Sequence, residues 1–221
     1  LCGASMLFYS GHAARAAARC PAHDPGKLPV MIVIVDYKTA NLGSIVNMFK
    51  RIGAPARVAE KPADLQGASR ILLPGIGHFD TCARNLRSAG FASALEEPVL
   101  LGGIPLLGIC VGAQLVLESS EEGPTPGLGF LPGHTRRLQV NDPRLKIPHM
   151  GWNNVRVEQP HPLLAHFQAD DELYFVHSYY VVPRDTAVIA TETDYSQPFC
   201  SSIWRDQLFA VQFHPEKSQA A

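Results

Sequence analysis

The segment Gly108–Gly112 has the residue types and spacing of a nucleophile elbow. Its sequence, Gly-Ile-Cys-Val-Gly, lies between an apolar run and a helical pattern, so Cys110 is expected at a sharp strand-to-helix turn. Such a turn crowds the neighbours of the nucleophile and leaves room only for small residues. It also places the thiol at a helix N-terminus, where the dipole favours the nucleophilic thiolate. A buried structural cysteine between glycines is the alternative interpretation of this pentapeptide alone.

A second group of chemically active residues lies in the sequence Phe-His-Pro-Glu at 213–216. A thiol nucleophile needs a base, and the base needs an acceptor that fixes its tautomer. His214 can supply the base and Glu216 the acceptor. A lone His-x-Glu sequence is more typical of a strand-end histidine and a solvated carboxylate. Combined with an elbow cysteine in the same chain, it predicts a Cys110–His214–Glu216 triad.

Backbone donors for a developing oxyanion are expected in the sequence Pro-Gly-Ile-Gly at 74–77 and at the start of the helix after Cys110. The loop follows a predicted strand, and doubly wound sheets bind ligands at the carboxyl ends of parallel strands. On its own, this sequence would be an ordinary turn. The expected oxyanion-hole donors are the N–H groups of Gly75, Ile76, Gly77 and Val111.

Alternating strands and helices are expected to position these residues. Met31–Val35 is a continuous apolar run, typical of a buried parallel strand, and a helix follows that Asn41 caps and Gly53 ends. Further strands are predicted at Arg70–Leu73 and Pro105–Ile109. After Cys110, a helix is expected whose buried face carries Ala113, Val116 and Leu117.

The second half of the chain has aromatic and β-branched runs separated by turn residues, which predict partly antiparallel strands. The runs are Tyr174–Val182, Ala187–Thr191, Phe199–Trp204 and Leu208–Phe213. The fold class predicted from the whole pattern is α/β: one domain with a central, mostly parallel, mixed sheet and helices on both faces.

The composition limits the class of protein. The 221 residues, 46% hydrophobic and 18% charged, can bury one sizeable core. The net charge of −1 gives no basic field for nucleic acid or an anionic membrane, and no apolar run could span a bilayer. The five cysteines form no CxxC pair, so we expect a reducing, cytoplasmic location and no metal or cofactor. No chemistry is assigned to Cys2, Cys20, Cys82, Cys200, His12, His23, His134, His161 or His166.

Six ordered motifs between Met31 and Ser218 resemble known families. The runs GICVGAQLVLESSEEG, PGIGHF and VQFHPEKS are similar to those of the class I (triad) glutamine amidotransferases. The runs VDYKTANLGSI, PHMGWNNV and YFVHSYY resemble, more narrowly, the glutaminase subunits of imidazole glycerol phosphate synthases. The resemblance implies a single class I glutamine amidotransferase domain with a nucleophile elbow.

This resemblance implies a reaction and a partner. Cys110 would attack the carboxamide of glutamine to give a thioester and ammonia, water would release glutamate, and His214 would move the protons. The ammonia would pass to a (β/α)8-barrel cyclase subunit, in a heterodimer that makes imidazole glycerol phosphate and the aminoimidazole carboxamide ribotide (AICAR) in histidine biosynthesis.

The resemblance also implies binding residues. Those expected to hold the glutamine are Gln114 and Glu118 on the helix after the elbow, with His177, Ser178 and Tyr179 on the facing wall. Those expected at the cyclase interface are Asn41, Trp152, Tyr174 and Lys217. Simpler interpretations of these last four are a helix cap, a core aromatic, a strand aromatic and a solvated lysine.

The two ends of the chain depart from the pattern of the family. Residues 1–30 are expected to be a disordered leader or a non-native extension, with a transit peptide as a further option. The amidotransferase domain would span 31–221. Because the family usually continues past Ser218 into a final helix, that helix is expected to be truncated.

Three alternatives remain. Another class I glutaminase subunit, of the pyridoxal phosphate or anthranilate type, would share the triad, but the GWN run and Lys217 argue against it. A non-catalytic domain of the same fold is disfavoured because all three triad residues are present. A general cysteine hydrolase or peptidase would act on a peptide amide without depending on a partner.

Overall fold

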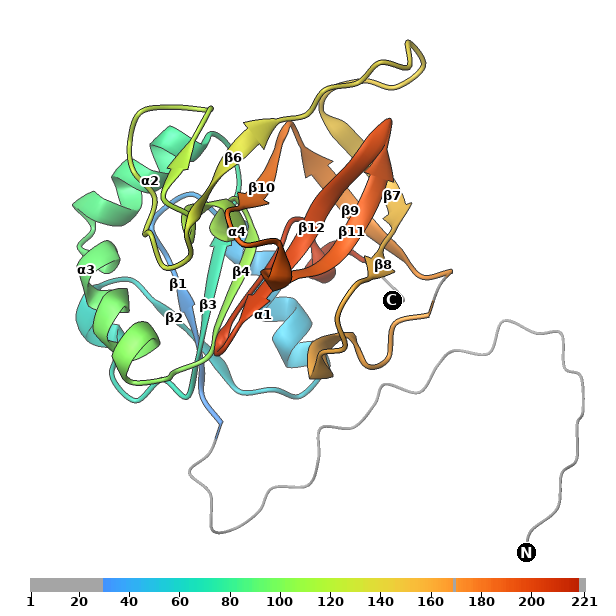
Figure 1. Cartoon of the computed structure of the whole chain (residues 1–221). Helices are drawn as coiled ribbons and strands as arrows, with labels where there is room; N and C mark the ends of the chain where they lie inside the picture. The colour runs from blue at the N-terminus through green and yellow to red at the C-terminus, as the bar shows by residue number, and fades with distance from the viewer. Residues whose placement is uncertain (1–29, 169, 219–221) are drawn as a thin grey trace, which may run out of the picture.

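A central sheet of eight strands organises the chain, with the order β2-β1-β3-β4-β13-β12-β11-β8. The computed structural model describes residues 30–168 and 170–218 (Figure 1). The parallel strands are β1 (Ile32–Val35), β2 (Ala56–Ala59), β3 (Arg70–Gly75), β4 (Leu106–Cys110) and β13 (Leu208–Val211). The antiparallel strands are β12 (Gln197–Arg205), β11 (Ile189–Tyr195) and β8 (Arg156–Val157).

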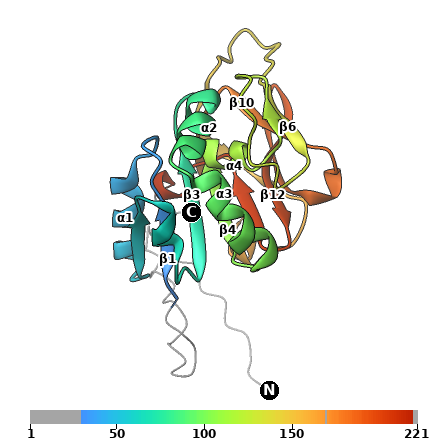
Figure 2. The same ribbon diagram turned by 90° about the vertical axis from the view of Figure 1, so that its left-hand side faces the viewer.

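Helices cover both faces of the parallel part of this sheet. The helix α1 (Leu42–Arg51) lies on one side, and α2 (Phe79–Ser88) and α3 (Phe91–Glu96) lie on the other (Figure 1; Figure 2 shows the second group from the front). This double cover explains why Val33, Ile34 and Val35 of β1 are all fully buried. A π-helical turn, Glu97–Leu101, leads from α3 back toward β4.

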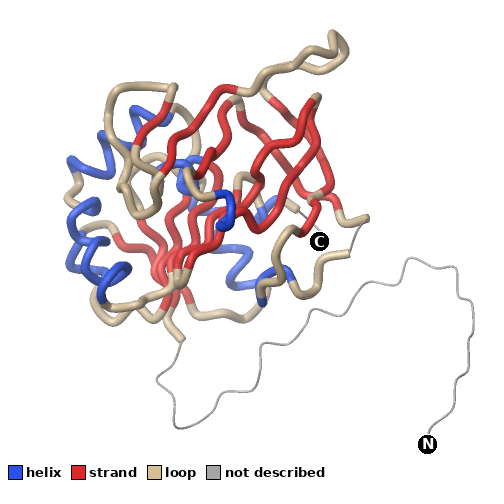
Figure 3. Tube along the Cα trace, viewed as in Figure 1, coloured by secondary structure: helices blue, strands red, loops and turns tan. Residues whose placement is uncertain are grey.

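Two smaller sheets complete the fold, and Figure 3 draws the strands of all three sheets in red. One has the strand order β10-β6-β5, and the other pairs β7 with β9. Their strands are β5 (Ser119–Ser120), β6 (Gly133–Arg137), β10 (Tyr179–Pro183), β7 (His149–Asn154) and β9 (Glu172–His177). Short segments of 3₁₀ helix join the elements, one of them at Pro215–Lys217.

The expected α/β class and mixed sheet are present, but several boundaries differ from those predicted. The run Tyr174–Val182 forms two strands in different sheets, because the chain turns a corner at Ser178, where no glycine or proline marks it. The helix after the elbow, α4 (Val111–Leu115), ends before Val116. Asn41 stands at the N-cap of α1, yet its side chain makes no capping hydrogen bond.

Some predictions fall on residues outside those described. These are the leader, apart from Val30 at its end, and the truncated helix expected after Ser218. Within residues 30–168 and 170–218, no helix has the length and apolar character needed to cross a membrane. The three cysteines described, Cys82, Cys110 and Cys200, are free thiols.

Candidate active site

Cys110 occupies a strained turn between the last residue of β4 and the first of α4. Its φ of 55° and ψ of −112° lie in a region that residues with a Cβ rarely adopt. The flanking glycines make the turn possible. A Cβ on Gly112 would lie 1.8 Å from the carbonyl oxygen of Leu73, and one on Gly108 would lie 2.8 Å from the oxygen of Gly112. This is the steric requirement predicted for a nucleophile elbow.

His214 and Glu216 form a buried pair at the end of β13. The Nδ1 atom of His214 lies 2.7 Å from Oε1 of Glu216, and the two side chains are 1% and 5% exposed. Because a carboxylate only accepts, Nδ1 carries the proton. The Nε2 atom of His214 has no hydrogen-bond partner among residues 30–168 and 170–218.

The pKa of His214 reflects this environment. Burial lowers it, but the proximity of Cys110, the hydrogen bond to Glu216 and the charge of Glu216 outweigh burial and raise the pKa from 6.5 to about 9. His214 is therefore mostly protonated at neutral pH. An imidazolium next to the sulfur is the partner that a cysteine thiolate requires.

Cys110 and His214 share one cavity of about 320 Å³. This volume falls near the lower end of the range of about 300–1,000 Å³ that is typical of small-molecule sites. Polar groups converge in it from the turn after β3, from α4, from the corner between β9 and β10, and from the turn after β13. Its lining residues are Ile76, Gly77, Cys110, Val111, Gln114, Glu122, Pro148, Val176, His177, Ser178, Tyr179, His214 and Lys217.

A chain of amides connects Gln114 with the nucleophile. The Nε2 of Gln114 donates to the carbonyl of Tyr179 (3.0 Å) and to Oε1 of Gln212 (3.1 Å), and Nε2 of Gln212 donates to Sγ of Cys110 (3.7 Å). This leaves Oε1 of Gln114 buried without a donor among the described residues. Gln212 was missed from sequence because it stands just past the end of β13, and its contact with Cys110 joins segments 102 positions apart.

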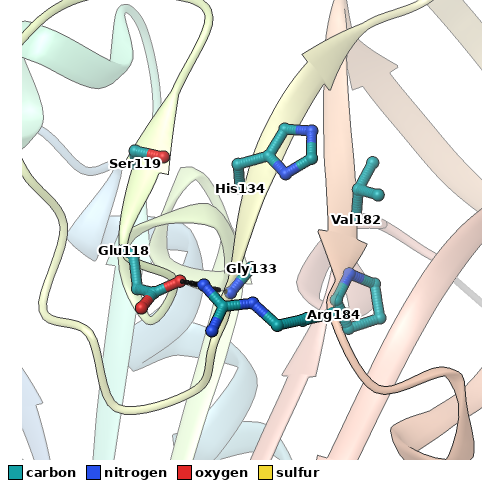
Figure 4. Close-up of a pocket in the computed structure, with 7 residues that line it drawn as sticks. Glu118, Ser119, Gly133, His134, Val182 and Arg184 are labelled. Atoms are coloured by element: carbon teal, nitrogen blue, oxygen red, sulfur yellow. Dashed lines mark hydrogen bonds and ion pairs between the residues drawn. The ribbon is translucent and has the colours of Figure 1, made fainter.

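Glu118 does not line the cavity and was wrongly placed there. Its carboxylate accepts from the backbone N–H of Gly133 and from Arg184, each at 2.9 Å, beside a separate pocket of about 430 Å³ (Figure 4). The prediction assumed a helix long enough to put Glu118 one turn beyond Gln114, but α4 ends at Leu115. Glu122 lines the cavity instead, and its Oε2 accepts from Phe79 N–H at 2.7 Å.

The predicted oxyanion donors are only partly in place. Ile76, Gly77 and Val111 line the cavity, whereas Gly75 does not. The N–H of Ile76 donates to the carbonyl of Thr39 at 2.8 Å and is therefore not available to a substrate.

Side chains behind the loop hold it in this conformation. The Tyr37 hydroxyl donates to the carbonyl of Pro74 at 2.6 Å, and the Cys82 thiol donates to that of Ile76 at 3.4 Å. Gly75 packs so closely that a Cβ there would lie 2.5 Å from the Tyr37 hydroxyl. The sequence carried no signal for either residue: Tyr37 lies 37 positions before Pro74, and Cys82, six positions after Ile76, stands on α2 with no motif around it.

Three of the four residues expected at a partner interface, Trp152, Tyr174 and Lys217, form a row that leads from the surface to His214. Trp152 pairs with Tyr174 across β7 and β9, with ring centroids 5.6 Å apart, and Nζ of Lys217 lies 5.5 Å from the Tyr174 centroid. The Tyr174 and His214 rings are 6.5 Å apart. Trp152 is 46% exposed, which argues against a purely core role. Asn41 is exposed at the start of α1, the helix that contacts the Pro215–Lys217 turn.

The chain belongs to the class I glutamine amidotransferase family, whose model matches residues 33–221. This confirms both the resemblance drawn from the motifs and the predicted fold class. The strand-turn-helix geometry at Cys110 and the mixed sheet are therefore those of a glutamine amidotransferase domain.

Similar proteins narrow the class. An imidazole glycerol phosphate synthase subunit, HisH 2, from Pseudomonas aeruginosa is 42% identical over 85% of this chain and 93% of its own length. The subunit HisH from Syntrophotalea carbinolica is 44% identical over 86% of this chain and 94% of its own. A solved glutamine amidotransferase structure, 21% identical, superimposes with a TM-score of 0.63 over 83% of this chain and 90% of its own, which supports the fold.

Proposed function

We propose that this chain is the glutaminase subunit of an imidazole glycerol phosphate synthase and hydrolyses glutamine to glutamate and ammonia. The observation that carries the proposal is the buried His214–Glu216 pair beside Cys110 in a cavity of small-molecule size. The names of relatives at 42% and 44% identity support the choice of synthase.

The geometry supports a thioester mechanism. The Cys110 thiolate adds to the carboxamide carbon of glutamine, and the proton on Nε2 of protonated His214 passes to the departing nitrogen, which leaves as ammonia. Water then attacks the thioester and gives a proton to the now neutral His214, so that glutamate leaves and the thiolate–imidazolium pair is restored. Glu216 holds the ring orientation and stabilises the imidazolium throughout.

Recognition of the amino-acid end of glutamine falls to Gln114 and Glu122. An α-ammonium group brings donors only, so it needs acceptors. Gln114 offers a buried oxygen that has no donor among the described residues, and Glu122 is a carboxylate in the same cavity. The corner formed by His177, Ser178 and Tyr179 supplies the opposite wall.

The state of the oxyanion loop predicts a low glutaminase rate for the isolated subunit. While the N–H of Ile76 is bonded to Thr39, the tetrahedral intermediate lacks one of its expected donors. Loss of one such donor typically costs about 10²–10³ in kcat. A partner that rotates the peptide before Ile76 toward Cys110 would supply it.

The partner proposed is a (β/α)8-barrel cyclase subunit that receives the ammonia. Exposed Met150 and Trp152 on β7, together with Lys217 and Asn41, offer it an apolar surface with polar groups next to the active site. A partner that contacts Trp152 would be linked to His214 through the rings of Trp152 and Tyr174.

Stimulation by candidate partners tests this function. Glutamate release would be measured for the chain alone and with a barrel cyclase, a pyridoxal phosphate synthase or an anthranilate synthase subunit, each purified with its own substrate. We expect a large stimulation by the cyclase alone. Cys110→Ala should abolish it while ammonia-driven cyclase activity continues. Stimulation by either other synthase, or by none of them, would contradict the proposal.

A further inference from the structure

Two histidines, His149 on β7 and His177 on β9, form a hydrogen-bonded relay that ends in the wall of the substrate cavity. Nδ1 of His149 lies 3.1 Å from Nε2 of His177, and the two residues pair directly across the two strands. Nδ1 of His177 lies 2.9 Å from the carbonyl oxygen of Tyr179. Both rings are nearly inaccessible, at 3% and 5% exposure.

The Tyr179 carbonyl, at one end of the relay, determines which ring nitrogen of each histidine carries the proton. The Tyr179 carbonyl can only accept, so Nδ1 of His177 carries a proton. A neutral His177 then has a bare Nε2, and Nδ1 of His149 must donate to it. Nε2 of His149 is bare in turn and accepts from Nδ2 of Asn153 at 3.3 Å, an amide group that also donates to Asp194 O at 3.0 Å.

The surroundings keep both rings neutral. His149 is stacked between Tyr195 and Phe175, with centroid distances of 3.9 Å and 4.8 Å. Burial lowers the pKa of His149 to about 4, and burial with the neighbouring His149 lowers the pKa of His177 to about 3. A proton added to either ring would set two donors against each other, so the relay has one tautomeric state across the neutral range.

The relay ends at the atom that organises the cavity. The Tyr179 carbonyl accepts from His177 and also from Nε2 of Gln114, so both of its lone pairs are used. The His177 bond spans Ser178 and closes the corner at which the chain passes from β9 to β10. Ser178, Tyr179 and Gln114 all line the cavity of Cys110.

We propose that His149 is a positioning residue for the substrate wall. By donating to Nε2 of His177, it anchors the ring whose Nδ1 proton holds the Tyr179 carbonyl in register with Gln114. Without His149, Nε2 of His177 is a buried acceptor with no donor from His149, so the ring loses this anchor and the corner at Ser178 loosens. His149 touches no reacting atom. The inference rests on the proposed glutamine site.

Exposed and buried side chains alternate along β7, and this alternation connects the relay with the partner-facing surface. Met150 and Trp152, on either side of Gly151, are 63% and 46% exposed, whereas His149 is buried. The strand therefore presents its partner-facing side chains and the first donor of the relay on the same short segment, so a shift of β7 by a bound partner would act on the His149–His177 bond.

Two substitutions distinguish the hydrogen-bond donor of His149 from the space that its ring fills. His149→Asn keeps a donor at the position of Nδ1, and His149→Leu removes it while leaving an apolar side chain of similar size. Tyr195→Phe is the matched control, because it keeps the ring stacked on His149 and changes only contacts to Lys146. Imidazole ¹⁵N spectra of the full chain and glutamine KM and kcat of the complex with the cyclase are the readouts.

We expect His177 to be protonated at Nδ1 alone in the wild type, in His149→Asn and in Tyr195→Phe. His149→Leu should keep this tautomer but show the ¹⁵N resonance of His177 Nε2 shifted to that of a ring nitrogen that accepts no hydrogen bond. Its KM should be about tenfold higher, the effect of one lost buried hydrogen bond, with kcat within about threefold. A wild-type His177 protonated at Nε2 overturns the inference even if His149→Leu does not fold. So does an unchanged KM in His149→Leu. Absence of glutamine turnover in the wild type would instead refute the proposed function, because the spectra test the relay without substrate.

Discussion

Replacing Glu216 by glutamine tests the triad through the tautomer of His214. The substitution preserves shape and removes one negative charge from a buried hydrogen bond of 2.7 Å. The second oxygen of Glu216, Oε2, is buried and has no hydrogen-bond partner among the described residues. An amide nitrogen placed there would leave its N–H groups without acceptors, which is costly in a buried site. The amide nitrogen is therefore expected to face Nδ1 of His214.

The size of the effect follows from this orientation. Loss of the charge alone weakens the hydrogen bond by roughly 1–2 kcal/mol, or about tenfold in rate. An amide donating to Nδ1 also forces the His214 proton onto Nε2 of a neutral ring, which then has neither the charge nor the fixed proton position of the imidazolium. A wrong tautomer of this kind costs on the order of 10⁴ in kcat in a serine protease triad. We expect a loss of on the order of 10³–10⁴ in kcat for Glu216→Gln.

The assay is glutamate release by the complex with the cyclase, with ammonia-driven cyclase activity as an internal control. Glu96→Gln, the same chemical change at an exposed position on α3, is the matched variant and should retain full activity. An NMR titration should show the pKa of His214 falling from about 9 toward 6.5, because the charge of Glu216 no longer offsets the lowering of the pKa by burial. A Glu216→Gln enzyme within threefold of wild type, or with His214 still titrating near 9, would refute the reasoning.

Three further predictions test the elbow, the substrate pocket and the buried relay. Gly112→Ala should destabilise the fold by about 3 kcal/mol or more because its Cβ would meet the carbonyl of Leu73, whereas Gly43→Ala, in open helix, should not; thermal melts that show equal losses would contradict this. Glu122→Gln should raise KM for glutamine about tenfold, the effect of a lost charged contact, and leave kcat nearly unchanged; a fall in kcat alone would be inconsistent with ammonium binding. The pKa values of His149 and His177, lowered from 6.5 to about 4 and about 3, mean that the unfolded chain binds more protons below pH 6.5, so the free energy of unfolding should fall between pH 6.5 and 4; a flat profile would oppose it.

The parts of the site that the sequence predicted well are those that short motifs carry. The elbow glycines are required by a steric constraint within one short turn. A Cβ at Gly108 or Gly112 would collide with neighbouring backbone atoms, so no other residue fits there. His214 and Glu216 are two residues apart, so their contact needs only one turn of chain. The parallel strands were recognisable because burial on both faces produces continuous apolar runs, as in β1.

The parts that were missed depend on where the chain turns in three dimensions. Glu118 was assigned to the pocket on the assumption that a helix continues past Leu115, and the early end of α4 brings Glu122 there instead. The corner at Ser178 has no turn residue to announce it. Tyr37 and His149 act on the site through hydrogen bonds to segments 28 or more positions away, which no periodicity reports.

Covalent trapping at the active site tests the central claim most directly. The complex with the cyclase would be treated with an electrophilic glutamine analogue, digested and analysed by mass spectrometry. We predict one adduct, on the peptide that contains Cys110, with protection by glutamine and no adduct in Cys110→Ala. An adduct on the peptide of Cys82 or Cys200, or equal labelling of the wild type and Cys110→Ala, would contradict the assignment of Cys110 as the nucleophile.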